Sequence, residues 1–381
     1  MTTMSDAAII WQLPHLLRRG LSIPRIAGNR IASVLWPSYS RLVMVGDGAN
    51  WSITWDVREV SLIARKLGIR VSCTGHALGI QRQSVFYASQ FAALLNSRGL
   101  DAGNRIGLAY FHGDPSSLEP NLVECFGALV RNQDRIHRIQ VSHAAMRGRL
   151  LESGIPAEKV FLIPIGINPG FFPFQTTASR LQARRTYGLP ESAVIIGSFQ
   201  KDGVGWGRGD EPKKIKGPDV FLKAIELLKS RIPELFVLLS GPARGFVKDG
   251  LSRLGVPYRH VYLKNYALIG QLYQALDLYL VTSREEGGPK AVLESMATGV
   301  PLVTTRVGQA ADLVQHGRNG WLVDVEDAEG LAQWAEHAIA SRNSPAVLEV
   351  LKEGRKTAEA NTYDSQAELW KEFFKGFVET T

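Results

Sequence analysis

Two glutamates with seven residues between them, Glu286 and Glu294, are the side chains whose types and spacing best fit a chemical role. A carboxylate accepts hydrogen bonds from paired hydroxyls, so one glutamate can hold the ribose of a nucleotide and the other a transferred sugar. If the residues between them were all helical, the two positions would lie about 12 Å apart along the helix axis. That distance is close to the span from a ribose across a diphosphate to a hexose. The spacing therefore predicts a sugar-diphosphate site, with solvated surface charges as the alternative.

The local sequence predicts which elements position these acids. Residues 277–282 are expected to form a buried strand, Gly287 and Gly288 a flexible turn, and residues 289–298 a helix that begins at Pro289 and ends before Gly299. Ligands of open α/β sheets bind beyond the carboxyl ends of strands. This turn is therefore a favoured place for a ligand.

The start of the predicted helix is expected to bind phosphate. The backbone N–H groups from Gly288 through Ala291 to Val292 have no acceptors within the helix, and the helix dipole adds partial positive charge there. Lys290 lies in the same first turn, where a cation opposes the dipole by about 0.3–1 kcal/mol. A lysine at this position therefore favours an anion beside it.

Both halves of the chain alternate short apolar runs with amphipathic stretches, which predicts parallel sheets covered by helices. In the first half, strands are expected at 42–45, 70–73, 106–110 and 160–163, and amphipathic stretches at 53–67 and 84–97. In the second half, strands are expected at 194–199, 235–240, 259–263, 277–282 and 301–304, and helices at 218–230, 244–254, 267–275 and 289–298. The Pro- and Gly-rich segment 164–173 reads as a linker. The predicted class is α/β, with two doubly wound Rossmann-like domains, 1–165 and 166–360, facing a cleft.

Two strand ends in the first half offer further ligand contacts. Small residues around Gly48 would let the backbone approach a ligand closely, although Trp51 replaces the third glycine of a dinucleotide fingerprint and an ordinary tight turn is the alternative. His112 follows strand 106–110 beside Gly113. It can bond a sugar hydroxyl or an acceptor, and a purely structural hydrogen bond is the alternative.

The stretch from Thr282 to Val323 resembles family 4 glycosyltransferases, which are retaining enzymes of the GT-B fold marked by two glutamates at this spacing. The segments 299–305 and 317–323 match as well. The resemblance is specific in the C-terminal half and weaker before it. It implies transfer of a sugar from a nucleoside diphosphate sugar to an acceptor hydroxyl, and the basic charge of the chain adds the expectation of polysaccharide or glycolipid assembly. It also implies that the terminal segment 361–381 crosses back onto the first domain.

The resemblance assigns roles to the residues already singled out. Glu286 would contact the donor sugar, Glu294 would hold the ribose, and the amides after Gly287 would meet the phosphates. The counterpart of His112 lies near the reacting centre, and the loop that carries Gly48 approaches the diphosphate from the opposite side of the cleft.

Two cations are expected to neutralise the diphosphate. The family usually places an arginine after a strand glycine and a lysine a few residues later. Here Ser198 follows Gly197 and the loop is longer. Lys216 matches the lysine, which makes it a third implied catalytic residue beside Glu286 and His112. Lys201 is predicted to replace the arginine, with Arg208 as a rival and a solvated basic loop as the alternative.

Composition restricts the class of protein. A chain of 381 residues has room for two domains, and 45% hydrophobic with 21% charged residues is typical of a soluble globular protein. The two cysteines, Cys73 and Cys125, favour neither a disulfide framework nor a Cys-based metal site. The eight histidines do not cluster either. We therefore expect a cytoplasmic protein without metal or other cofactor, whose co-substrate is the nucleotide sugar.

The charge lies mainly in the first half. Residues 1–165 carry 18 Lys and Arg against 11 Asp and Glu, whereas residues 166–381 carry 26 against 25. A basic half can attract anionic lipid, nucleic acid or an acidic acceptor. Residues 9–19 mix apolar, aromatic and basic side chains as an interfacial helix does, and a helix packed on the protein itself is the alternative. The expected partners are the donor, a saccharide or lipid-linked acceptor and a membrane surface, without nucleic acid.

Two other functions fit part of the pattern. A sugar-nucleotide epimerase shares this architecture and donor class, but it needs no acceptor. A non-catalytic module that binds nucleotide or nucleic acid would explain the basic half, yet it would not need Glu286, Lys290 and Glu294 together.

Overall fold

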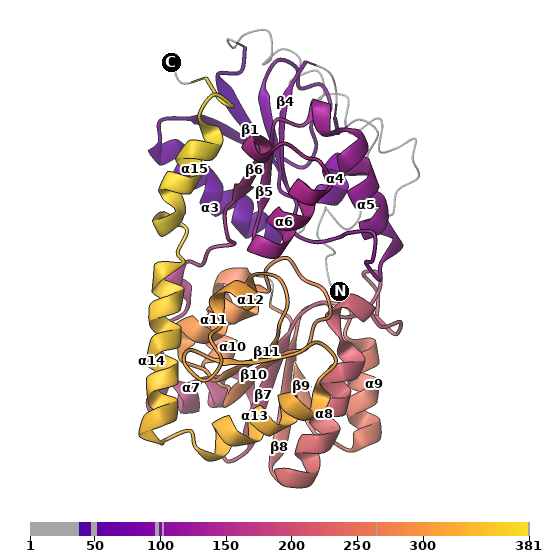
Figure 1. Ribbon diagram of the computed structural model, residues 1–381. Coiled ribbons are helices and arrows are strands. Elements are labelled where there is room, and N and C mark those ends of the chain that lie inside the picture. Colours follow the sequence, from indigo (N-terminus) through magenta and orange to yellow (C-terminus); the bar gives the residue numbers. More distant parts are fainter. Residues whose placement is uncertain (1–37, 47–51, 96–98, 101–102, 264, 380–381) are drawn as a thin grey trace, which may run out of the picture.

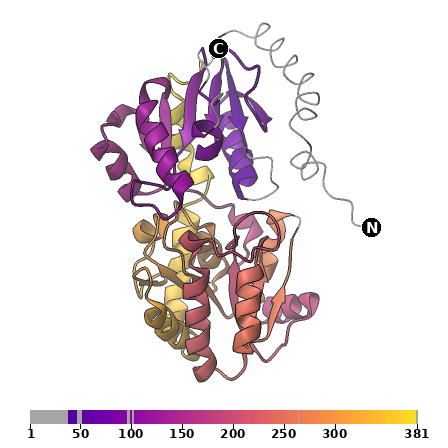
Figure 2. The same ribbon diagram turned by 90° about the vertical axis from the view of Figure 1, so that its right-hand side faces the viewer.

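The computed structural model describes residues 38–46, 52–95, 99–100, 103–263 and 265–379. The chain forms two lobes stacked end to end, each a parallel sheet with helices on both faces (Figure 1 and Figure 2). The predicted α/β class with two Rossmann-like domains is confirmed. The predicted loop around Gly48 and the segment 9–19 lie outside the described residues.

The first lobe contains a six-stranded parallel sheet in the order β2-β1-β3-β4-β5-β6. Its strands are β1 (Arg41–Val45), β2 (Arg70–Thr74), β3 (Ser84–Tyr87), β4 (Arg105–Ala109), β5 (Arg138–Val141) and β6 (Val160–Leu162). The helices are α3 (Ser52–Lys66), α4 (Gln90–Leu94), α5 (Pro120–Arg131) and α6 (Ala144–Glu152). The inner strands are buried on both faces, which suits their continuous apolar sequences.

One first-lobe prediction is wrong. The amphipathic stretch expected at 84–97 begins with the strand β3, which pairs with β1 and β4 at the centre of the sheet. All four residues of β3 are buried. A short, fully buried run cannot be assigned to helix or strand by periodicity, so only its neighbours in the sheet decide it.

The second lobe contains a six-stranded parallel sheet in the order β12-β11-β10-β7-β8-β9. Its strands are β7 (Val194–Phe199), β8 (Leu235–Ser240), β9 (Tyr258–His260), β10 (Leu278–Val281), β11 (Leu302–Thr305) and β12 (Trp321–Val323). Its helices are α7 (Thr177–Tyr187), α8 (Pro218–Arg231), α9 (Gly245–Leu254), α10 (Ile269–Tyr273), α11 (Lys290–Thr298), α12 (Gln309–Leu313), α13 (Ala328–Ala340) and α14 (Pro345–Ala360). The helix expected at 267–275 is shorter, because residues 266–268 form a 3₁₀ turn before α10.

The chain passes between the lobes twice, and the two passages lie side by side. Ile167 N–H donates to the Asn361 carbonyl at 3.1 Å, and Tyr363 N–H donates to the Ile167 carbonyl at 3.3 Å. Gly166 lies so close to Tyr363 that a Cβ atom there would be 2.9 Å from its backbone nitrogen. The predicted boundary at residues 165 and 166 falls in the first passage.

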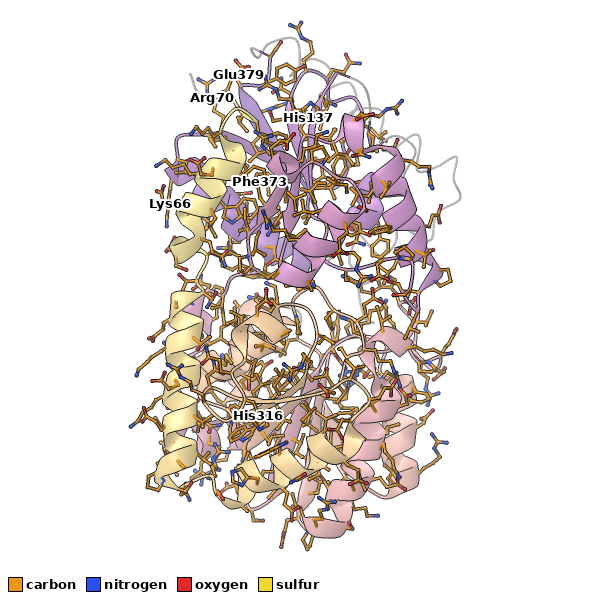
Figure 3. The ribbon with its side chains drawn as sticks, viewed as in Figure 1. Lys66, Arg70, His137, His316, Phe373 and Glu379 are labelled. Carbon is orange, nitrogen blue, oxygen red and sulfur yellow. The ribbon has the colours of Figure 1, made fainter. Side chains whose placement is uncertain are left out.

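After the second passage, the last helix, α15 (Ala367–Phe374), packs on the first lobe (Figure 1). Its aromatic side chains, of which Figure 3 labels Phe373, join the apolar core formed by β1, β3 and α3. The Ser84 hydroxyl of β3 donates to the Phe377 carbonyl at 2.5 Å, and Lys66 of α3 pairs with Asp364 at 2.6 Å. The C-terminal segment therefore ties the first lobe to α14 of the second.

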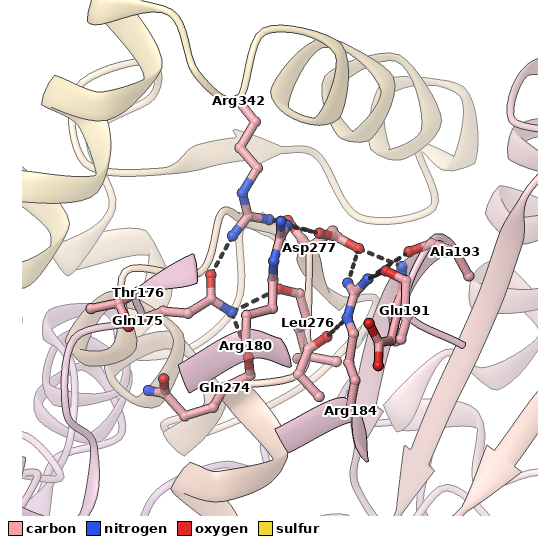
Figure 4. A network of polar contacts seen from close by, with 12 residues as sticks. Gln175, Thr176, Arg180, Arg184, Glu191, Ala193, Gln274, Leu276, Asp277 and Arg342 are labelled. Carbon is pink, nitrogen blue, oxygen red and sulfur yellow. Dashed lines mark hydrogen bonds and ion pairs between the residues drawn. The ribbon is translucent and has the colours of Figure 1, made fainter. Parts of the chain in front are cut away.

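A buried charge network holds the chain where it enters the second lobe (Figure 4). Asp277, just before β10, pairs with Arg180 at 2.7 Å, Arg184 at 2.5 Å and Arg342 at 3.2 Å. The same carboxylate accepts the Ile195 N–H of β7 at 2.8 Å. One aspartate thus joins α7, the central strands and the end of α13, which fixes the base of the second sheet.

Candidate active site

The two predicted acids line one cavity between the lobes. It measures about 150 Å³ and lies beyond the carboxyl ends of β7 and β10, as expected for an open α/β sheet. Ser52 of α3 contributes a wall from the first lobe. The second lobe contributes Glu286, Glu294, Lys201, Tyr266 and the start of α11. We call this space the donor cavity.

Glu286 is held in an ionised state by a cation. The Lys216 ammonium pairs with its carboxylate, and the Ser283 hydroxyl donates to it at 3.1 Å. Burial opposes ionisation of Glu286, but Lys216 and the hydrogen bonds outweigh it, so the pKa is lowered. Gly217 follows Lys216 with φ +59°, and a Cβ at 217 would collide with the Thr282 carbonyl. Only glycine therefore lets the turn that carries Lys216 lie this close to Thr282. Lys216 and Glu286, both expected at the donor site, contact each other through this ion pair.

Glu294 is buried beneath two tyrosines that the sequence analysis did not identify. The Tyr266 hydroxyl donates to one carboxylate oxygen, and the Tyr273 hydroxyl donates to the other at 2.9 Å. Burial raises the pKa of Glu294, although both hydroxyls and Lys290 act in the opposite direction. A carboxylate oxygen can accept more than one hydrogen bond, so the two oxygens of Glu294 can still accept hydrogen bonds from ribose hydroxyls.

The start of α11 faces the donor cavity through only some of the predicted residues. Gly288, Lys290 and Ala291 line the cavity. Val292 does not, because its side chain is buried in the core and its N–H donates to the Pro289 carbonyl at 3.0 Å. The helix begins at Lys290, so the axial separation expected for a continuous helix between the acids does not apply.

Gly287 and Gly288 do not form a flexible turn, because both pack closely against neighbouring residues. A Cβ on Gly287 would collide with Phe111 of the first lobe, and one on Gly288 would lie 2.8 Å from both Gln309 and Ile165. The Gly287 carbonyl also accepts the Ser142 hydroxyl at 2.7 Å. The glycines are therefore required by the close approach of the two lobes, and Gly287 supports the donor cavity without lining it.

The structure separates the two candidates for the displaced cation. Lys201 lines the donor cavity, and its ammonium lies 4.5 Å from the centroid of the Trp206 ring. Burial lowers the pKa of Lys201, and the nearby Lys216 acts in the same direction. Arg208 instead pairs with Asp210 at 2.5 Å and Asp249 at 2.6 Å, with 57% of its side chain exposed. Lys201 is the better placed of the two.

The lengthened loop after β7 is fixed by a buried ion pair that the sequence did not reveal. Arg244 donates to the Ser198 carbonyl at 2.6 Å and to the Ser198 hydroxyl at 3.0 Å. Its Nε lies 2.9 Å from Asp202 Oδ1, and both side chains are fully buried. Arg244 therefore contacts the position where the family usually has its arginine, but it serves the fold from inside the lobe.

Lys290, for which the sequence favours a bound anion, has a carboxylate of the protein beside it in the structure. Its Nζ lies 2.6 Å from Asp56 Oδ1 of α3 in the first lobe. The sequence carried no signal for this partner, because the two residues are far apart in the chain and meet only across the lobes.

A second cavity of about 180 Å³ lies on another side of Glu286. It is lined by His112, His143 and Arg149 of the first lobe and by Glu285, Glu286 and Arg306 of the second. Burial lowers the pKa of His112 to about 4, and Lys216 contributes, so this histidine is neutral at pH 7. Glu285 accepts the Ser117 hydroxyl at 2.8 Å across the lobes. We call this space the second cavity.

The described residues contain no group of three His, Cys, Asp or Glu side chains arranged to hold a metal ion. Among the helices of these residues, none is long and apolar enough to cross a bilayer.

Part of the second lobe is similar to known glycosyltransferases. Residues 203–341 match the model for glycosyl transferases group 1. A D-inositol 3-phosphate glycosyltransferase of Stackebrandtia nassauensis is 28% identical over 183 residues, which are 45% of this chain and 38% of that protein. The lipopolysaccharide core biosynthesis mannosyltransferase LpsB of Rhizobium meliloti is 28% identical over 171 residues, which are 42% of this chain and 46% of LpsB. The matches thus span less than half the length of these relatives.

The fold comparison covers more of the chain. The crystal structure of Anabaena HepE in complex with UDP and glucose superposes with a TM-score of 0.68, covering 88% of this chain and 99% of HepE at 16% identity. The predicted GT-B fold is therefore confirmed. The chain is a GT-B protein that resembles the family 4 glycosyltransferases.

Proposed function

We propose that this protein transfers a sugar from a nucleoside diphosphate sugar to an acceptor hydroxyl, with retention at the anomeric carbon. The observation that supports it best is the position of Glu286, which lines both the donor cavity and the second cavity. A reaction between two bound substrates needs two adjoining sites, so that the reacting atoms of donor and acceptor come into contact.

The donor cavity suits a nucleotide sugar. Glu294 and Tyr266 offer hydrogen-bond acceptors for ribose, and the amides of Lys290 and Ala291 lie at the positive end of α11. Lys201 and Lys216 add positive charge without a metal ion. HepE, which shares the fold, was crystallised with UDP and glucose, so UDP sugars are the first donors to test.

The chemistry would be mainly electrostatic. The bond from the anomeric carbon to the diphosphate breaks, the acceptor oxygen bonds to that carbon, and the acceptor proton passes to the departing phosphate on the same face. Negative charge grows on the diphosphate during this step, and preorganised cations and amides stabilise it. Glu286 would orient the donor sugar, and neutral His112 can hydrogen-bond the sugar or the acceptor.

The second cavity suits the acceptor. Carboxylates, guanidinium groups and neutral imidazoles together bind polyhydroxylated compounds, and Glu285, Arg149 and His143 supply one of each. We propose a saccharide or lipid-linked saccharide, and relatives named for an inositol phosphate and for the lipopolysaccharide core are consistent with that class. Cytoplasmic location and contact of the basic first half with a membrane surface belong to the same proposal.

The test starts from the donor. UDP, GDP, TDP and CDP sugars are screened by thermal shift, and the product of the best donor is examined by NMR for its anomeric configuration. Glu294→Ala should weaken binding of that donor, and Glu359→Ala, at an exposed position on α14, is the matched control. No stabilisation by any nucleotide sugar would exclude the proposal, and so would inversion at the anomeric carbon.

The rival functions give different results in the same experiment. An altered sugar nucleotide released without any acceptor would indicate the epimerase. Binding of RNA that Glu294→Ala leaves intact, without nucleotide-sugar binding, would indicate the non-catalytic module.

A further inference from the structure

We infer that Asp56 of the first lobe is a positioning residue of the donor site and acts through Lys290. The inference rests on the proposed function, because it concerns how the diphosphate of a nucleotide sugar is held. No sequence pattern links the two residues, which lie in different lobes.

Lys290, Asp56 and Tyr363 each contact the other two. Its Nζ lies 2.6 Å from Asp56 Oδ1 and 3.0 Å from the Tyr363 hydroxyl. The Tyr363 hydroxyl in turn donates to the same Asp56 oxygen. The ammonium also lies 5.1 Å from the Tyr266 ring centroid and 5.7 Å from that of Tyr363. Lysine, carboxylate and phenol thus fix one another.

Burial makes this pairing necessary. The side chains of Lys290 and Asp56 are only 13% and 17% exposed. A buried ammonium without a partner is costly, and Lys290 also faces the unfavourable end of the α11 dipole. Asp56 offsets both effects, so the long lysine side chain keeps one orientation.

Asp56 approaches Lys290 from outside the donor cavity. Lys290 lines that cavity, whereas Asp56 and Tyr363 line a separate small space within the first lobe, beside Met44 and Trp370. An ammonium has three N–H groups, and Asp56 and Tyr363 account for two acceptors. The lysine can therefore donate to a phosphate while it keeps both protein partners.

The neighbouring residue supports the other end of the donor. Trp55 packs against Tyr266 with ring centroids 5.6 Å apart, and the Tyr266 hydroxyl donates to Glu294. Two consecutive residues of α3 thus support the lysine proposed for phosphate and, through Tyr266, the carboxylate proposed for ribose. The donor site is complete only when the first lobe is in contact with the second.

This arrangement predicts coupling between donor binding and the contact of the lobes. If the first lobe strengthens the donor site, a bound donor must stabilise the contact by the same factor. Couplings of this kind typically change affinity by about 5- to 150-fold.

The experiment measures binding of UDP, GDP, TDP and CDP by calorimetry, each beside its nucleoside, which lacks the phosphates. Asp56→Asn should lower the affinity for the diphosphate that the wild-type protein binds most tightly. The loss should be about tenfold, within the range of such couplings, and the affinity for the nucleoside should not change. Lys290→Met should have a similar effect. The double variant should be hardly weaker than either single variant, because both remove one interaction.

Two further variants separate positioning from a structural role. Asp312→Asn is the matched control, since Asp312 also crosses the lobes, accepting the Ala144 N–H at 2.8 Å, but lies away from the donor cavity. It should bind diphosphate like the wild type. If Asp56→Asn fails to fold, Tyr363→Phe removes only the hydroxyl and should show the same selective loss in smaller measure.

The results distinguish this inference from the proposed function. A wild-type protein that binds none of the four diphosphates overturns both. Normal diphosphate affinity in Asp56→Asn, or in Tyr363→Phe if that variant is used, together with weakened binding in Lys290→Met, overturns the inference alone. Equal loss of nucleoside and diphosphate also overturns it, because that pattern indicates a general structural role.

Discussion

The ammonium of Lys201 lies 4.5 Å from the centroid of the Trp206 indole, at the edge of the donor cavity. Trp206 is 67% exposed, yet the loop that carries it is held by the buried pair of Arg244 and Asp202. An aromatic ring can hold a lysine in place without neutralising its charge. Lys201 therefore remains able to attract a diphosphate.

Lys201→Ala is expected to weaken nucleoside diphosphate binding by about 10- to 100-fold, since a hydrogen bond to a charged group contributes about 1.5–3 kcal/mol. Arg208→Ala is the control, because Arg208 already pairs with two aspartates away from the cavity. Calorimetry at two salt concentrations measures both. A larger loss for Arg208→Ala would show that the arginine is the phosphate ligand after all.

Glu285→Gln is expected to raise the KM for the acceptor and to leave slow hydrolysis of the donor unchanged. Glu285 lines the second cavity and not the donor cavity, whereas Glu286 lines both. The amide keeps the size of the side chain but loses its charge. Steady-state kinetics with varied acceptor gives the KM. An unchanged acceptor KM with a raised donor KM would contradict the assignment of the two cavities.

Arg244→Met is expected to destabilise the protein by about 3–5 kcal/mol, because it leaves Asp202 buried without its cation. Burial raises the pKa of Asp202, whereas Arg244 acts in the opposite direction and favours the carboxylate. Urea unfolding followed by circular dichroism gives the change. Arg208→Met, which removes two exposed ion pairs, should cost less than about 1 kcal/mol. Similar losses in the two variants would rule out the structural role of Arg244.

His112→Gln is expected to reduce the loss of stability on acidification. The pKa of His112 is lowered to about 4 by burial and by Lys216, whereas an unfolded histidine titrates near 6.5. Between these values the unfolded chain binds the proton first. The contribution of neutral His112 is therefore complete above about pH 6.5 and is lost as the pH falls towards 4.

The measurement is the free energy of unfolding at pH 7 and at pH 4.5. The wild type should lose about 1–3 kcal/mol more than His112→Gln over this interval, given the size of the shift. If the free energy of unfolding fell by the same amount in the two proteins, the pKa of His112 in the folded state would not be lowered, which would contradict the prediction.

The sequence alone determined the class of fold and most of the second lobe. Strands β7 and β8 have the predicted bounds, and Glu286 and Glu294 both line the donor cavity. These features depend on periodic burial, on turn residues and on hydrogen bonds between residues close in the chain. Such local signals are present in the sequence itself.

Only the tertiary structure decided how the donor site is completed. Asp56 beside Lys290, the tyrosines over Glu294, Arg244 behind Ser198 and the packing of Gly287 on Phe111 all join segments distant in the sequence. Their distances depend on how two sheets and two crossing segments pack, and no local pattern encodes that. The partner of each buried charged group was therefore decided by packing, within the second lobe for Arg244 and across the lobes for Lys290, because a buried charge takes whichever opposite charge the packing brings within reach.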